Sequence, residues 1–301
     1  MQLDHDEIIE TRRMIREQSL DIRTVTMGIS ILDCVSEDPD KFCRNLSEKL
    51  LSKAKNVNSV CDDIQAEYGI SIVNRRISIT PIALVTAGPQ YTEDSYVKIA
   101  KTLDDVGKEL NINFIGGFGG FIQKGFTNSD SRLISVLPRV LSETKRVCSF
   151  FNVASTKTGI NMDGIGLISK MLKETSKRTA AESGLGCAKF VAFANSVDDS
   201  PFMAGAYHGA GEPENEINVG ISGPGVIKSA IEQHEHSSFV DLADIIKKFT
   251  FKITRLGQLI ANIASERLNV SRGIVDLSLA PTSKVGDSVA EILQEMGLEY
   301  V

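Results

Sequence analysis

The residues best suited to chemistry lie between two apolar runs, Ala188 to Ala194 and Ile217 to Ile221. His208 stands among small residues there, and carboxylates at Asp198 and Glu212 flank it along the chain. An imidazole that small neighbours leave open to approach can act as a general acid or base, and nearby carboxylates can orient it. We therefore predict that His208, Asp198 and Glu212 are catalytic residues.

A metal site is the alternative for the same segment. With Asp198, Asp199 and Glu212 nearby, His208 offers the ligands that a hard or borderline divalent cation takes. However, no HExxH or HxH spacing surrounds the histidine. On the sequence we assign no metal ligand and leave the cofactor unknown.

Small and polar residues recur where the predicted strands end. Ligands of parallel α/β folds bind at the carboxyl ends of strands, where loops carry function on a rigid base. From these positions we predict a substrate-binding site that consists of Gly119, Asn152, Ser155, Asn161, Asn195, Ser222 and Gly223. Turn-forming residues also end strands for purely local reasons, which is the alternative explanation. Asn152 is the strongest member, because an amide inside an apolar strand needs hydrogen-bond partners.

The elements that must position these residues alternate along the chain. Periodicity and capping residues predict helices over 5–18, 38–68, 93–110, 130–143, 162–182, 226–234, 239–268 and 287–296. They predict strands over 21–33, 75–86, 112–117, 146–154, 188–194, 217–221 and 273–280, and Asp163 as a helix N-cap. Such alternation favours a single α/β domain over residues 1–301, with a largely parallel sheet. With the start of a further strand after Gly297 the count is about eight, which favours a barrel, with an open doubly wound sheet as the alternative.

Composition and charge limit the classes of partner and the cellular location that we expect for this chain. The net charge of −6 argues against nucleic acid as the main partner, which usually meets a basic face. No apolar run approaches the roughly 18–20 residues of a membrane span, and the charged start lacks the apolar core of a signal peptide. The five cysteines contain no CxxC pair, which argues against a disulfide framework and against a zinc knuckle. We expect a cytoplasmic protein with a small-molecule ligand.

Three stretches carry a resemblance to a known family. They are NVASTKTGINMDGIG (152–166), FANSVDDSPFMAGAYHGAGEPENEINVGISGPG (193–225) and VDLSLAPTSKVGDSVAEILQEMGLEYV (275–301). Together they resemble the domain of unknown function 711 family, often labelled pyruvate formate-lyase-like. The resemblance implies a ten-stranded α/β barrel around an inner loop, a homodimer, and a longer protein of which this chain is the N-terminal part. It implies no assigned reaction and no assigned catalytic residue.

Glycyl-radical enzymes share the implied fold, but the resemblance does not extend to their chemistry. They need a glycine in an RVxGY-like loop, and residues 1–301 contain no such loop. The sequence therefore favours a cytosolic enzyme that acts on a small polar metabolite at the strand ends, without glycyl-radical chemistry. A metabolite-binding regulatory protein without catalysis is the alternative, and a purely structural dimer is a third hypothesis.

Overall fold

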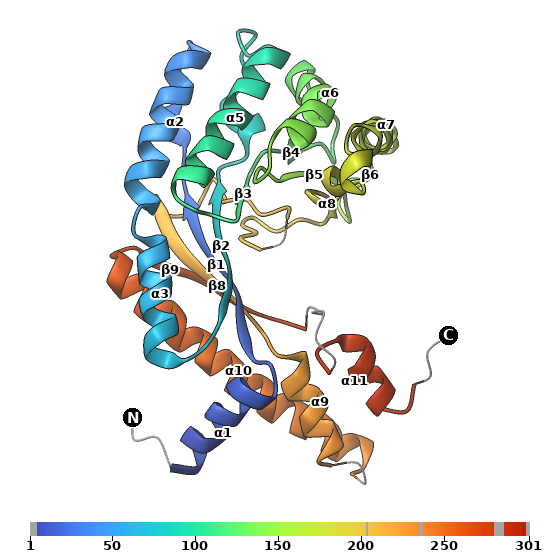
Figure 1. Cartoon of the computed structure of the whole chain (residues 1–301). Coiled ribbons are helices and arrows are strands. Elements are labelled where there is room, and N and C mark those ends of the chain that lie inside the picture. Colours follow the sequence, from blue (N-terminus) through green and yellow to red (C-terminus); the bar gives the residue numbers. More distant parts are fainter. Residues whose placement is uncertain (1–4, 203, 235–236, 280–285, 299–301) are drawn as a thin grey trace. The chain divides into compact units, whose positions relative to one another are not determined.

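The computed structural model describes residues 5–202, 204–234, 237–279 and 286–298, and it alternates helices and strands (Figure 1). The helices are α1 (His5–Glu17), α2 (Pro39–Ala54), α3 (Val57–Tyr68), α4 (Ile82–Val85), α5 (Glu93–Glu109), α6 (Asn128–Glu143), α7 (Met162–Arg178), α8 (Leu185–Ala188), α9 (Pro224–Glu232), α10 (Phe239–Leu268) and α11 (Val289–Glu295). The strands are β1 (Asp21–Ile29), β2 (Ile72–Ile79), β3 (Phe114–Gly116), β4 (Gly120–Phe121), β5 (Ser149–Ser155), β6 (Gly159–Ile160), β7 (Phe190–Ala194), β8 (Asn215–Ser222) and β9 (Ser271–Ser278). Two 3₁₀ turns, η1 (Leu32–Cys34) and η2 (Ala180–Glu182), complete the described elements.

Most predicted elements are present, with three corrections. The long helix predicted over 38–68 is two helices, α2 and α3. The strand predicted over 75–86 ends at Ile79, because Pro81 lacks an N–H for a strand ladder and begins helix α4 instead. The strand predicted over 21–33 ends at Ile29, before η1. The two-residue strands β4 and β6 were not predicted, since so short a strand leaves no periodic signal.

The described strands form two sheets. The first has the order β3-β2-β1-β8-β9, and the second joins β4, β5 and β6, with β7 also paired to β5. The pairs β2–β3, β4–β5 and β5–β7 are parallel, whereas β5–β6 is antiparallel. The predicted α/β class with parallel strands is thus confirmed. The predicted eight-stranded barrel is wrong for the described residues, because their strands divide between two open sheets instead of closing one.

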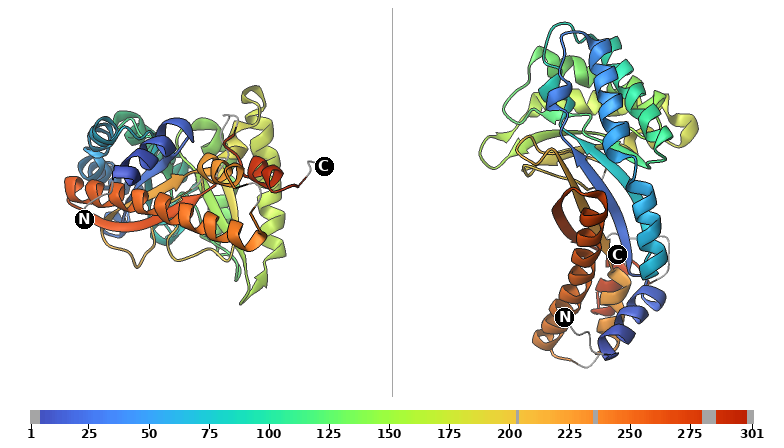
Figure 2. Two further views of the ribbon diagram at one scale, coloured as in Figure 1. Left: turned by 90° about the horizontal axis from the view of Figure 1, so that it is seen from below. Right: turned by 90° about the vertical axis from the view of Figure 1, so that its left-hand side faces the viewer.

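The chain divides into two compact units. Unit 1 comprises residues 1–25, 59–74 and 217–301, and unit 2 comprises residues 26–58 and 75–216. In unit 1 the long helix α10 packs against β9 and α9, and its course beside β9 can be followed in Figure 2. None of the helices among the described residues is long and apolar enough to cross a membrane. A single domain over residues 1–301 stays a prediction.

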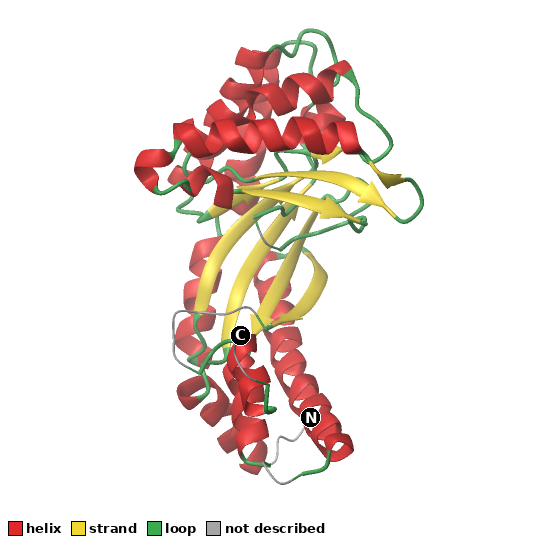
Figure 3. Ribbon diagram, turned by 90° about the vertical axis from the view of Figure 1, so that its right-hand side faces the viewer, coloured by secondary structure: helices red, strands yellow, loops and turns green. Residues whose placement is uncertain are grey.

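Unit 2 contains the second sheet, and helices lie on one side of it (Figure 3). Helices α5, α6 and α7 pack one against the next, and α8 contacts the start of β7. The other side carries aromatic side chains: the rings of Phe150 and Tyr207 stack with centroids 4.4 Å apart, and Phe193 and Phe121 meet Tyr207 edge-on. Since Tyr207 belongs to the segment between β7 and β8, this aromatic packing fixes that segment against the sheet.

Candidate functional site

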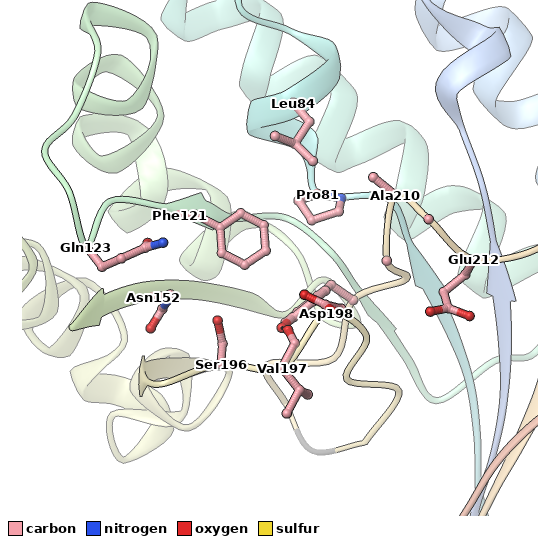
Figure 4. A pocket seen from close by; sticks show the side chains of 13 residues that line it. Pro81, Leu84, Phe121, Gln123, Asn152, Ser196, Val197, Asp198, Ala210 and Glu212 are labelled. Atoms are coloured by element: carbon pink, nitrogen blue, oxygen red, sulfur yellow. The ribbon is translucent and has the colours of Figure 1, made fainter. Parts of the chain in front are cut away.

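A pocket of about 530 Å³ lies in unit 2 at the ends of several strands. Phe121 is the last residue of β4, Pro81 follows β2, and Ser196, Val197 and Asp198 follow β7. All these side chains line the pocket (Figure 4). The carboxyl ends of parallel strands are where α/β folds place ligands, so this pocket is a candidate ligand site.

An amide and a hydroxyl form the inner polar wall of this pocket. Asn152 is 2% exposed, and its amide orientation follows from its neighbours: Nδ2 donates to the carbonyls of Ala154 and Phe193 at 3.0 Å. Its Oδ1 then accepts the Ser196 hydroxyl, also at 3.0 Å. The expectation that a buried amide here needs partners is confirmed, and the network holds Ser196 at the pocket wall.

Carboxylates supply the charge of the pocket. Asp198 and Glu212 both line it, together with the amide of Gln123, and Figure 4 shows Gln123 and Glu212 at opposite ends. Among the described residues that line this pocket there is no Lys, Arg or His. A negative lining of this kind repels anions, so it favours a neutral polar or cationic ligand.

Tyr207 anchors the loop that carries Asp198. Its hydroxyl donates to the carbonyl of Val197, and burial raises the pKa of this phenol, which keeps it protonated as a donor. The backbones of Ser200 and Tyr207 also exchange hydrogen bonds of 2.8 and 3.2 Å. The pocket loop is therefore tied to the aromatic face of the sheet and not held by its ends alone.

Behind the pocket wall lies a buried group of three titratable side chains, which we call the His208 cluster: Asp199, His208 and Glu216. One ligand atom from each lies within 4.8 Å of the others. His208 Nδ1 is 3.9 Å from Asp199 Oδ1 and 3.7 Å from Glu216 Oε1. The imidazole is 0% exposed, and both carboxylates are also buried. Gly209, whose N–H donates to Asp199 Oδ1 at 2.7 Å, lines the pocket, so the two sites share this backbone.

The environment of the His208 cluster perturbs Asp199 strongly. Burial raises the pKa of Asp199 to about 7, and the negative charges of Glu216 and Glu212 act in the same direction. The hydrogen bond from Gly209 opposes the shift without cancelling it. A carboxyl this perturbed beside a pocket is a recognised mark of functional sites.

Of the three predicted catalytic residues, the structure brings Asp198 and Glu212 to the pocket and buries His208 behind it. The ring Nε2 of His208 is 2.8 Å from the carbonyl oxygen of Pro213, and because a carbonyl oxygen can only accept, Nε2 is the donor. A role for His208 as acid or base toward a pocket ligand stays a prediction.

Of the predicted substrate-binding residues, Asn152 lines the pocket and three others serve local structure. Asn161 is the N-cap of α7, accepting Gly164 N–H at 3.0 Å, so the predicted cap at Asp163 is wrong by two positions. Asn195 Oδ1 accepts the Thr156 N–H at 2.7 Å. The Ser155 hydroxyl bonds within its own turn to Thr158, at 2.6 Å between the two hydroxyl oxygens.

The remaining predicted binding residues also lie outside the pocket lining. Ser222 is the last residue of β8 and Gly223 is the N-cap of α9, and both residues belong to unit 1. Gly119 is buried under β5: a Cβ there would lie 1.9 Å from the carbonyl oxygen of Phe150. A ligand role for these three stays a prediction, and for Gly119 close backbone packing is a sufficient reason for glycine.

Sequence reasoning did not assign Glu216 or Gly28 to the site. A signal existed for Glu216, because alternation along β8 places it on the same face as Asn218 and Ser222, and all three are buried. Nothing in the sequence linked Gly28 of β1 to His208, about 180 residues away, since sheet topology alone creates that contact.

Comparison with known proteins agrees with the family resemblance of the three sequence stretches. A UPF0210 protein of Listeria monocytogenes is 52% identical over 299 residues, covering 99% of this chain and 66% of the relative. UPF0210 proteins of Halothermothrix orenii (54% over 293 residues) and Thermoanaerobacter sp. (52% over 299 residues) match 97% and 99% of the chain. The chain spans about two thirds of the length of these relatives, 64–66%. These names assign neither a reaction nor a ligand. The family model described as Uncharacterised ACR (DUF711) matches residues 13–301, and the chain belongs to that family.

Proposed function

We propose that this chain binds a small polar metabolite, neutral or cationic, in the unit 2 pocket and acts on it as an enzyme. The observation that carries the proposal is the pocket lining itself: two carboxylates and two amides, with no Lys, Arg or His among its described lining residues. Carboxylates accept hydrogen bonds from hydroxyl and ammonium groups, whereas they repel phosphate and carboxylate ligands. Amines and polyhydroxy compounds are the ligand classes that match this lining.

Asp198 and Glu212 are the proposed acid and base of the reaction. Both carboxylates line the same cavity from the segment between β7 and β8, so a ligand in the cavity meets both. Paired carboxylates exchange protons with a bound ligand without any cofactor. Asn152 and Ser196 would orient the ligand, because their mutual hydrogen bond holds them rigidly at the wall.

The experiment is a ligand screen on the full-length protein, read by thermal unfolding and followed by a turnover assay on each ligand found. We expect amines or polyhydroxy compounds to raise Tm and phosphorylated compounds to leave it unchanged. Asp198→Asn and Glu212→Gln should each lower turnover about 100-fold or more while the protein stays folded. Asp163→Asn, an exposed carboxyl on α7, serves as the matched control and should leave turnover unchanged.

Two results would decide against parts of this proposal. If an anionic ligand binds and Asp198→Asn strengthens its binding, the proposed ligand class is wrong. If ligands bind in the pocket but none turns over, a metabolite-binding regulatory protein replaces the enzyme. The ten-stranded barrel, the homodimer and the cytosolic location are proposals for the whole protein, and this chain spans about two thirds of the length of the relatives that it matches.

A further inference from the structure

We infer that the His208 cluster is a binding site for one divalent transition-metal cation of the Zn²⁺ or Mn²⁺ class. Asp199, His208 and Glu216 each offer one ligand atom, all within 4.8 Å of one another, and all three side chains are more than nine-tenths buried. The inference concerns the wall behind the pocket, so it does not depend on which metabolite the pocket binds.

The distances are those of ligands around a shared ion and not those of a hydrogen-bonded ion pair. His208 Nδ1 lies 3.9 and 3.7 Å from the two carboxylate oxygens. A charge-assisted hydrogen bond would bring these atoms to about 2.7–2.9 Å. An ion that holds each ligand at about 2.1 Å can join atoms up to about 4.2 Å apart, which includes both observed separations.

The protonation pattern of His208 also points to a ligand. Its Nε2 is 2.8 Å from the Pro213 carbonyl, which can only accept, so Nε2 carries a proton. In the neutral imidazole, Nδ1 then holds a lone pair, and it has no hydrogen-bond partner among the described residues. Metal-binding histidines are usually fixed in this way, with the second ring nitrogen donating to a backbone carbonyl.

Charge balance gives a second, independent reason. The charged groups that act on Asp199 are both acidic, Glu216 and Glu212, and Glu216 also acts on it through a side-chain hydrogen bond. Two close carboxylates away from water are costly unless a cation or shared proton compensates them. A divalent cation compensates both and uses the lone pair of His208 as well.

The ligand set selects among metals. Ca²⁺ takes six to eight oxygen ligands, and Mg²⁺ is usually held by carboxylates and water, so neither explains a buried imidazole. One nitrogen and two carboxylate oxygens suit borderline cations such as Zn²⁺ and Mn²⁺. Three protein ligands are also the usual number where a metal keeps a further position for another ligand.

Space for the ring comes from Gly28 on β1. A Cβ at this position would lie 2.4 Å from His208 Nδ1 and 3.2 Å from Glu216 Cγ. Glycine at this position therefore leaves open the space in which the His208 ring and the Glu216 carboxylate approach each other. This is the arrangement of a built site in which the supporting backbone leaves room for its ligands.

The test is a titration of the chelator-treated full-length protein with Zn²⁺ and with Mn²⁺, followed by calorimetry and thermal unfolding. We expect one equivalent per chain and a rise in Tm of about 5 °C at 100-fold excess over Kd. Asp199→Asn and Glu216→Gln should weaken binding about 100-fold or more. Glu214→Gln is the matched control: it lies two residues from Glu216, pairs with Lys49 and Lys53, and should leave Kd within about 3-fold.

A second measurement needs no variant and covers the case in which a buried substitution unfolds the protein. Co²⁺ bound to the wild-type protein should give visible d–d absorption and one exchangeable, hyperfine-shifted ring N–H proton, that of His208 Nε2. The inference is overturned if the wild-type protein binds neither Zn²⁺ nor Mn²⁺ at millimolar concentration. Equal loss of binding in Glu214→Gln, or a Co²⁺ spectrum without a histidine ligand, would overturn it too.

Discussion

Unit 2 contains two clusters in which a basic side chain lies between two carboxylates, and they differ in almost every physical respect. One is the His208 cluster. The other, which we call the Lys49 cluster, consists of Asp33, Lys49 and Glu214. In the Lys49 cluster the ammonium lies 2.6 and 3.4 Å from the two carboxylates, whose side chains are 66% and 58% exposed. In the His208 cluster the corresponding distances are 3.9 and 3.7 Å, and the exposed fractions are 5% and 3%.

The pKa values of the carboxyl groups move in opposite directions. Burial acts to raise the pKa of Asp33, but the hydrogen bond and charge of Lys49 outweigh it and leave the pKa lowered. Hydrogen bonds from Lys53 and Lys49 lower the pKa of Glu214. In contrast, burial and acidic neighbours raise that of Asp199 to about 7. The Lys49 cluster therefore contains its own counter-charge, and the His208 cluster is built to receive one.

The largest expected effect comes from closing the space around His208. Gly28→Ala introduces a Cβ 2.4 Å from Nδ1, in a region where the ring is fixed by Pro213 and cannot turn away cheaply. We expect a loss of about 3 kcal/mol in the free energy of unfolding, the upper end for overpacking, and loss of metal binding. Urea denaturation and a Zn²⁺ titration of the folded fraction measure the two effects.

Gly166→Ala is the matched control for this substitution. Gly166 lies exposed inside α7, and a Cβ there would meet nothing within 4 Å. Alanine should stabilise the helix by about 0.5–1 kcal/mol and leave metal binding unchanged. If Gly28→Ala is as well tolerated as Gly166→Ala, the ring of His208 is not confined as the distances require.

Asp199→Asn tests whether the Asp199 carboxylate destabilises the metal-free protein and stabilises the metal-bound protein. In excess chelator we expect this variant to be more stable than wild type by about 1 kcal/mol, because one of two close buried carboxylates becomes neutral. With metal at 100-fold excess over Kd, wild type gains about 2.7 kcal/mol, so the order of stabilities should reverse. Thermal unfolding of both proteins with and without Zn²⁺ checks this. Stability in the same order under both conditions would contradict the cation site and leave a carboxyl pair that shares a proton.

Much of the fold was predictable from local pattern, and the exceptions have physical causes. Helix α5 begins after Thr92, whose side chain accepts the N–H of Ser95, and helix α10 spans the residues that its apolar stripe predicted. The prediction of a closed barrel was wrong, because strand count does not fix which strands pair. Strand β7 pairs with β5 and not with a strand of the first sheet, and no residue pattern encodes that choice.

The candidate site was predictable only where neighbours in sequence are also neighbours in space. Asn152 was identified because it is a polar residue within an apolar strand, and the structure shows its partners. Asp198 and Glu212 were predicted as the catalytic partners of His208, whereas Asp199 was named only as a possible metal ligand and Glu216 was assigned no role. The choice between adjacent carboxylates depends on which side of the backbone each faces, and loop geometry decides that.

The smallest expected effect concerns the Lys49 cluster. Lys49→Met retains most of the buried stem but removes the ammonium. The free energy of unfolding should fall by about 0.5–1 kcal/mol at pH 7, because both carboxylates are exposed and screened.

The folded pKa values of Asp33 and Glu214 lie below their ordinary values of 3.8 and 4.5. Their contribution is therefore fully present above those values and disappears as pH falls through the lower, folded pKa values. Urea denaturation of both proteins at pH 7 and about pH 3, at low and high salt, measures it. A difference that persists in acid or in high salt would mean that Lys49 acts through packing, and that the ionic contrast with the His208 cluster is smaller than the distances indicate.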